Sequence, residues 1–168
     1  MFNEKLLDEL RKYVEKHMTI RVFPACAEMR CMQKSVCDES VQNELEDFIK
    51  KNRSPTFTEV LFDFIDKKGS SDSDIYKKAG IDRRHFSKIR SNPDYKIGKN
   101  TALALALALE LNKKEADALL SAAGYSLSDC DTFDLVIQFC MEKNIYDIHS
   151  VNEALDYFSL KPLSGVSE

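Results

Sequence analysis

The stretch that most constrains the fold of this chain is residues 72–90, DSDIYKKAGIDRRHFSKIR, which has the pattern of two short helices joined by a turn. Ile75 and Ala79 fall on one face of the first helix. Gly80 follows where a helix ends in the left-handed conformation, which glycine adopts without steric cost. Asp82 is then well placed to cap a second helix. The sequence therefore predicts a helix, a sharp turn and another helix.

The second of these helices, residues 83–90, has two sides of opposite character. Phe86 and Ile89 form its apolar side. Its other side is almost entirely cationic and carries Arg83, Arg84, His85, Lys88 and Arg90. A helix that buries its apolar side in a domain presents such cations to solvent.

The segment DIYKKAGIDRRHFSKI resembles the helix-turn-helix of the lambda-repressor-like (Xre) family. Gly80 matches the turn glycine of that family, Ile81 its following aliphatic residue, and Asp82 its N-cap. Tyr76 stands where the family usually has alanine, and a larger side chain there changes how closely the two helices can cross. The resemblance implies a five-helix domain whose helix 83–90 enters the major groove of DNA.

A longer stretch, residues 56–163, resembles a tail domain attached to some bacterial macro-domain and related signalling proteins. The shared features are the run FSKIRSNPDY, an alanine and leucine helix, and an ending that contains FDL, IYDI and NEAL. This second resemblance implies a fold rather than an activity.

Charge is distributed unevenly along the chain, whose net charge is −4. Residues 77–99 contain eight Lys or Arg and two Asp, so they carry +6 and the remainder carries −10. Residues 100–168 contain four cations and eleven acids, a net charge of −7 that would repel phosphate. One basic patch on an acidic body is typical of a local anion-binding surface.

These features predict a DNA-binding transcriptional regulator that inserts helix 83–90 into the major groove of double-stranded DNA. Arg83, Arg84 and His85 lie in its first turn, where base edges are read, and Arg can form two hydrogen bonds with guanine. Phosphate contacts would come from four further cations: Lys88, Arg90, Lys96 and Lys99. A homodimer is expected, because one such module has a small footprint.

A second hypothesis assigns the same fold to a non-enzymatic adaptor in a bacterial or phage signalling or defence pathway. It is motivated by Tyr76 at the helix crossing, the acidic body and the unexplained N-terminal segment. A protein partner would bind through residues 1–55 or through the acidic face of residues 100–168. This hypothesis predicts protein binding that is insensitive to salt, with only weak binding to DNA.

Helical spacing of apolar residues recurs along most of the chain, and five Gly and four Pro are too few for an all-β domain. We therefore expect an all-α fold, with a mostly helical appendage for dimerisation or partner binding over residues 1–55 and a helix-turn-helix domain with a C-terminal helical extension over 56–168. The appendage would hold helices at 3–17 and 40–52 and a short extended piece at 19–25.

Residues 101–111, TALALALALEL, alternate with the period of a strand. Because alanine and leucine are strong helix formers and neither is β-branched, we expect a buried helix there. N-terminal caps of other helices are predicted at Thr56, Asn112, Asp131 and Ser150, where Thr56 and Ser150 each precede a glutamate by three residues in a capping box.

No catalytic motif is present: the chain lacks a phosphate-binding glycine loop, GxSxG and HExxH, and its three histidines are scattered. We expect no enzyme activity and no cofactor. Cys26, Cys31 and Cys37 are separated by four and five residues, whereas zinc sites hold cysteines in tighter pairs, so no metal site is expected. Reduced thiols, the lack of a long apolar run and the lack of a signal-peptide pattern predict a cytoplasmic protein outside the membrane.

Overall fold

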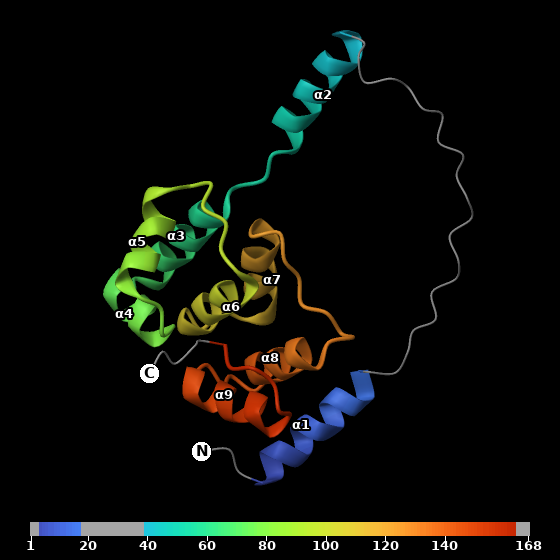
Figure 1. Cartoon of the computed structure of the whole chain (residues 1–168), viewed down its shortest axis with the longest axis vertical. Helices are drawn as coiled ribbons and strands as arrows, with labels where there is room; N and C mark the ends of the chain where they lie inside the picture. Colours follow the sequence, from blue (N-terminus) through green and yellow to red (C-terminus); the bar gives the residue numbers. More distant parts are fainter. Residues whose placement is uncertain (1–3, 18–38, 164–168) are drawn as a thin grey trace, which may run out of the picture. The chain divides into compact units, whose positions relative to one another are not determined.

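A computed structural model describes residues 4–17 and 39–163 of the chain (Figure 1). Within these residues every regular element is an α-helix and none is a strand, which confirms the predicted all-α class. In chain order the helices are α1 (Glu4–His17), α2 (Glu39–Asn52), α3 (Phe57–Lys68), α4 (Asp72–Lys78), α5 (Arg83–Ser91), α6 (Lys99–Ala108), α7 (Lys113–Ala122), α8 (Thr132–Glu142) and α9 (Ile148–Tyr157). The predicted extended piece at 19–25 and Cys26, Cys31 and Cys37 lie outside the described residues.

The described residues form two compact units. One unit contains α1 together with α3 to α9, and the other contains α2 and the residues that follow it as far as Pro55. We expected residues 1–55 to form a single appendage. The boundary near residue 55 is present, but α1 belongs to the main unit rather than to the appendage.

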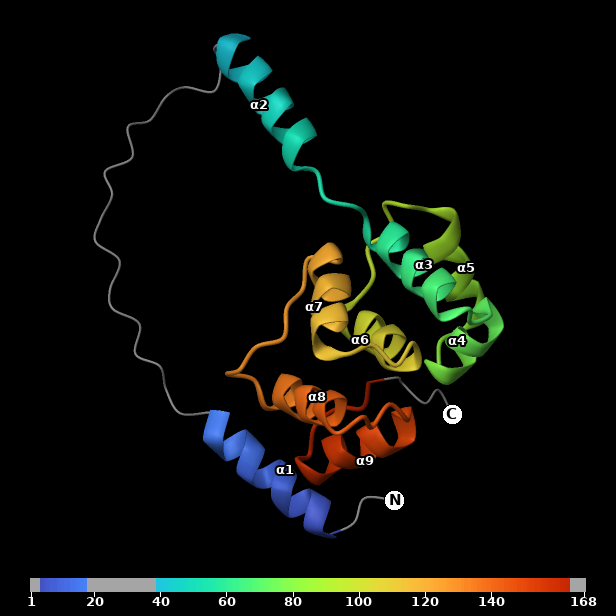
Figure 2. The same ribbon diagram turned by 180° about the vertical axis from the view of Figure 1, so that it is seen from behind.

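Helix α1 joins the main unit by burying its apolar face against α8 (Figure 2). Leu10 and Val14 are buried. The ring of Tyr13 packs edge-on against that of Phe139, with their centroids 5.4 Å apart, and its hydroxyl donates to Oε1 of Glu142 at 2.9 Å. The helical spacing of apolar residues in α1 indicated an apolar face that another element must cover. The residues that cover this face lie more than 120 positions later in the chain, so a local sequence pattern could not identify them.

Helix α6 forms the centre of the main unit, in contact with α4, α7 and α9 (Figures 1 and 2). Every residue from 102 to 108 is buried, so the alanine and leucine stretch is a helix, as predicted, and not a strand. In a helix, leucines at alternate positions fall into two stripes on nearly opposite sides. Such a helix can bury all its apolar surface only between two layers, and burying each leucine contributes roughly 2 kcal/mol.

The ends of α6 differ from the prediction of a helix over 101–111. It begins at Lys99, with Gly98 as its N-cap, and ends at Ala108. Glu110 then has a left-handed backbone with φ of 51°, and its carbonyl accepts a hydrogen bond from Nζ of Lys68 on α3 at 3.2 Å. This reversal starts the turn into α7.

Most predicted helix starts are confirmed. Thr56 and Asn112 each form a capping box with the glutamate three residues later, and Asp131 caps α8. The prediction at Ser150 is wrong. Helix α9 begins earlier, because the carboxylate of Asp147 accepts hydrogen bonds from both the amide and the hydroxyl of Ser150, each at 2.9 Å.

Candidate nucleic-acid interface

The turn between α4 and α5 is held by hydrogen bonds at both helix ends. The amides of Gly80 and Ile81 donate to carbonyls in the last turn of α4 at 3.1 and 2.9 Å, the pattern of a Schellman cap. Gly80 has φ of 63°, in the left-handed region that the sequence predicted for it. The carboxylate of Asp82 accepts from the amide of Arg84 at 2.6 Å and starts α5. Both helix ends are therefore determined by local residues.

The inner side of α5 is anchored by Phe86 and Ile89, which are both buried. The Phe86 ring lies 6.2 Å from that of Phe62 on α3 and 6.0 Å from that of Tyr76 on α4. Tyr76 is half-buried at this crossing, so it fills the space between α4 and α5. The hydroxyl of Thr58 donates to the carbonyl of Ile89 at 3.3 Å and ties the end of α5 to α3. These contacts direct the opposite side of α5 to solvent.

Four of the predicted DNA-binding cations are exposed and available to an external anion: Arg83, Arg84, Lys88 and Lys96. None of them has an ion-pair partner within the part of the chain that the structure describes. Arg84 and Lys88 are one turn apart and share the outward side of α5 with Ser87. The exposed side of α5 therefore carries positive charge that the protein itself does not neutralise.

Two other cations that we expected to contact phosphates instead form ion pairs with acidic residues of the protein itself. The guanidinium of Arg90 forms an ion pair with Asp72 of α4 and lies 5.1 Å from the centroid of the Phe62 ring. Nζ of Lys99 pairs with Oδ2 of Asp134 on α8 at 2.6 Å, where the Asp134 side chain is 0% and that of Lys99 28% exposed. Lys99 thus holds α6 to α8, and we no longer assign it to the interface.

His85 lies on the flank of α5 rather than on its outward side. It is half-buried, and its ring packs edge-on against Tyr95, with centroids 5.9 Å apart and planes at 75°. Tyr95 in turn packs on the core. The connection between α5 and α6 is further held by the hydroxyl of Tyr125, which donates to the carbonyl of Ile97 at 3.0 Å. This arrangement keeps Lys96 on the surface beside α5.

A shallow pocket of about 310 Å³ lies between α4 and α5 on the other flank. It is lined by Asp72, Ser73, Tyr76, Arg83, Phe86, Ser87 and Arg90. Two guanidinium groups could attract a phosphate here, but one of them already pairs with Asp72. An incoming phosphate would therefore compete with Asp72 for Arg90, which weakens anion binding at this point.

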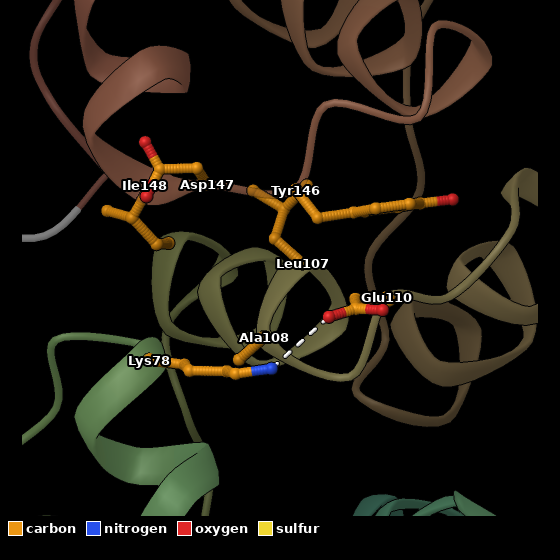
Figure 3. Close-up of a pocket in the computed structure, with 7 residues that line it drawn as sticks. All are labelled: Lys78, Leu107, Ala108, Glu110, Tyr146, Asp147 and Ile148. Carbon is orange, nitrogen blue, oxygen red and sulfur yellow. Dashed lines mark hydrogen bonds and ion pairs between the residues drawn. The ribbon is translucent and has the colours of Figure 1, made fainter.

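A second pocket, of about 230 Å³, is lined from α4, from the end of α6 and from the residues around the start of α9 (Figure 3). Across it, Nζ of Lys78 lies 3.2 Å from Oε1 of Glu110. The amide of Ser150 hydrogen-bonds the carboxylate of Asp147 and lowers its pKa. Burial raises the pKa of the neighbouring Tyr146 phenol. Two carboxylates line this pocket and its single lysine is already paired with Glu110, so the pocket does not suit phosphate.

Sequence reasoning missed the two acids that neutralise part of the basic patch. Asp72 is 18 positions from Arg90, and only the crossing of α4 and α5 brings them together. Asp134 gave a usable signal, because it is the only charged residue in the mostly apolar run TFDLVIQF. A carboxylate on the buried side of a helix needs a cation, since an unpaired buried charge is strongly destabilising.

Comparison with protein families, with curated proteins and with solved structures finds no match to this chain. The likeness of residues 72–90 to the Xre-type helix-turn-helix therefore stays a prediction. Among the described residues, no helix combines the length and the apolar character needed to cross a lipid bilayer. In the same residues, no group of three or more His, Cys, Asp or Glu side chains is arranged to hold a metal ion.

Proposed function

We propose that the protein binds double-stranded DNA through α5 and acts as a transcriptional regulator with an Xre-like helix-turn-helix. The observation that carries the proposal is the set of cations on and beside α5 that have no acidic partner within the described residues, above all Arg84 and Lys88. Their helix is held by its buried side, so little rearrangement is needed for docking.

The dimensions of α5 suit the major groove. An α-helix with its side chains is about 10–12 Å across, which matches the roughly 12 Å width of the groove. The 9 residues of α5 extend about 13 Å along the helix axis at 1.5 Å per residue. Its first turn carries Arg83 and Arg84, where guanine contacts are commonly made. Lys88 and Lys96 would contact phosphates. His85 and Arg90 are engaged with Tyr95 and Asp72 and would contribute less.

The first experiment is binding of the purified chain to its own promoter and to random duplexes across a salt series. Phosphate contacts by Lys88 and Lys96 predict a slope of log K against log salt of about −1.8 for each bound chain, since each phosphate contact contributes about −0.9. Promoter binding no tighter than the non-specific range of about 10⁻⁴ to 10⁻⁶ M would contradict the proposal.

Arg84→Ala then tests the base contact. We expect it to cost about 1–3 kcal/mol at the preferred site and to relax the base preference. Lys114→Ala is the matched control, because Lys114 is an exposed cation of the same compact unit on α7, away from α5. If both variants bind DNA equally and with the same base preference, Arg84 does not read a base.

The adaptor role is the second candidate. It is favoured by the internal neutralisation of Arg90 and Lys99, which leaves a smaller basic surface than the sequence implied. The adaptor hypothesis predicts a protein complex whose affinity does not change with salt. Pull-downs from the source cell that retain DNA and recover no protein would count against it.

A further inference from the structure

Helix α2 exposes an apolar side that nothing in the described part of its own compact unit covers. All its side chains from residue 42 to residue 52 are exposed. Leu45, Phe48 and Ile49 are the largest apolar ones, at 47%, 64% and 55%. They lie within about one helical turn of each other on one side. A patch of this kind is typical of a surface that another helix covers.

The charges on α2 are divided along its length. The first two-thirds contain Glu39, Glu44, Glu46 and Asp47 with no cation, and the end contains Lys50 and Lys51. Glu44 and Lys51 are seven residues apart, nearly two full turns, so they flank the apolar side on the same edge. An antiparallel copy of the same helix would bring acids opposite lysines, whereas a parallel copy would bring acids opposite acids.

We propose that α2 is a self-association element that pairs antiparallel with α2 of a second copy of this chain. Leu45, Phe48 and Ile49 of the two copies form the centre of the seam, and Glu44 of each copy lies beside Lys51 of the other. Such a contact is self-complementary and has two-fold symmetry, so it closes at a dimer. The proposal does not depend on DNA binding and is tested without DNA.

The pairing is expected to be weak. A helix of 14 residues is about 21 Å long, and two of them bury less than the roughly 1,200 Å² of a standard stable interface. We therefore expect a dissociation constant on the order of 10 µM, with a monomer–dimer equilibrium that depends on concentration.

The apolar seam is tested by sedimentation equilibrium of the full chain from about 1 to 500 µM, which spans the expected constant. Phe48→Glu should weaken self-association by about 100-fold, because it buries a charge at the centre of the seam. Asn43→Glu is the matched control. It adds the same charge on the opposite side of α2 and should leave the dissociation constant within about twofold.

Charge reversals test the antiparallel arrangement. Glu44→Lys and Lys51→Glu should each weaken the dimer by about tenfold, and the double variant should restore it, since the two exchanged charges would again face opposite charges across the seam. Lys50→Glu, on the outer side, is the control for the loss of positive charge. A chain that stays monomeric, a dimer unaffected by Phe48→Glu, or a double variant that is weaker than either single one would each overturn the proposal. In a monomeric chain, a change in melting temperature with Phe48→Glu would assign the apolar side to a contact within one copy.

Discussion

Replacing Lys99 by methionine separates a structural role from a DNA-binding role for this residue. Nζ of Lys99 is the only cation paired with Asp134 among the described residues. Without it, the buried carboxylate keeps one hydrogen bond, from the amide of Ser128 at 2.8 Å, and Oδ1 of Asp134 has no hydrogen-bond partner. Removing one member of a buried ion pair typically costs about 3–5 kcal/mol. Since the Lys99 side chain is 28% exposed, part of its charge is screened by solvent, and we expect a loss of about 2–4 kcal/mol.

The assay is urea unfolding of the full chain, followed by circular dichroism, with DNA binding measured on the same samples. A loss of about 3 kcal/mol moves the unfolding midpoint by about 1–2 M urea and lowers the melting temperature by about 6–12 °C. The slope of DNA affinity against salt should stay unchanged, because Lys99 would not contact phosphate. Lys96→Met, in the connection that precedes α6, is the matched control. It should leave stability within about 0.5 kcal/mol and make the salt slope less steep by about 0.9.

The double variant Lys99→Met/Asp134→Leu tests whether the cost arises from the unpaired charge. Replacing a buried ion pair by apolar residues of similar volume is often close to neutral, so this variant should be more stable than Lys99→Met alone. The reasoning fails if Lys99→Met changes stability by less than about 0.5 kcal/mol, or if it reduces the salt slope as Lys96→Met does.

Other contacts lead to three further predictions. Asp72→Asn should release Arg90 for phosphate, tighten DNA binding a few-fold and steepen the salt slope by up to about 0.9; weaker binding would mean that the ion pair orients Arg90. Asp147→Ala removes the N-cap of α9 and should cost about 1 kcal/mol. The hydrogen bond that the Asp147 carboxylate accepts from the amide of Ser150 lowers the pKa of Asp147 below its usual 3.8. The stabilisation by the cap should therefore be present above pH 3.8 and disappear as the pH falls through the folded-state pKa. Asp147→Asn should keep the cap without that acid dependence. At pH 8, iodoacetamide should label the exposed Cys130 but spare Cys140, because burial raises the pKa of the Cys140 thiol to about 12. Peptide mapping by mass spectrometry measures the labelling. Equal labelling of both cysteines in the native protein would contradict the buried position of Cys140.

The local features of the candidate interface were predictable because neighbouring residues determine them. Glycine adopts a left-handed backbone more easily than any other residue, which identified Gly80 as the turn. Aspartate is a strong N-cap, which identified Asp82, two positions later, as the start of α5. The spacing of Phe86 and Ile89 identified the buried side of α5 and, by elimination, its cationic side. The wrong N-cap predicted for α9 also arose from neighbouring residues, because Asp147 and Ser150 are both good N-cap residues. Only the structure shows that the Asp147 carboxylate accepts the hydrogen bond from the amide of Ser150 and is therefore the cap.

The alanine and leucine stretch shows where local pattern and composition disagree. Its alternation favoured a strand, while the helix propensities of its residues favoured a helix. Burial of every residue from 102 to 108 explains why alternation is compatible with a helix here. A helix that is covered on all sides has no polar face, so its sequence is free of the usual helical period.

The sequence by itself determined the helical class, most helix boundaries and the basic character of α5, since these depend on residues within a few positions of each other. Tertiary structure alone decided which cations remain available. Arg90 and Lys99 belong to the basic stretch in sequence, but Asp72 and Asp134 reach them through helix packing, across 18 and 35 positions. Ion pairing acts over a few ångströms in space rather than along the chain. The charge count of a segment therefore predicts the sign of the electrostatic potential around it, whereas only the fold determines which charges an outside partner can reach.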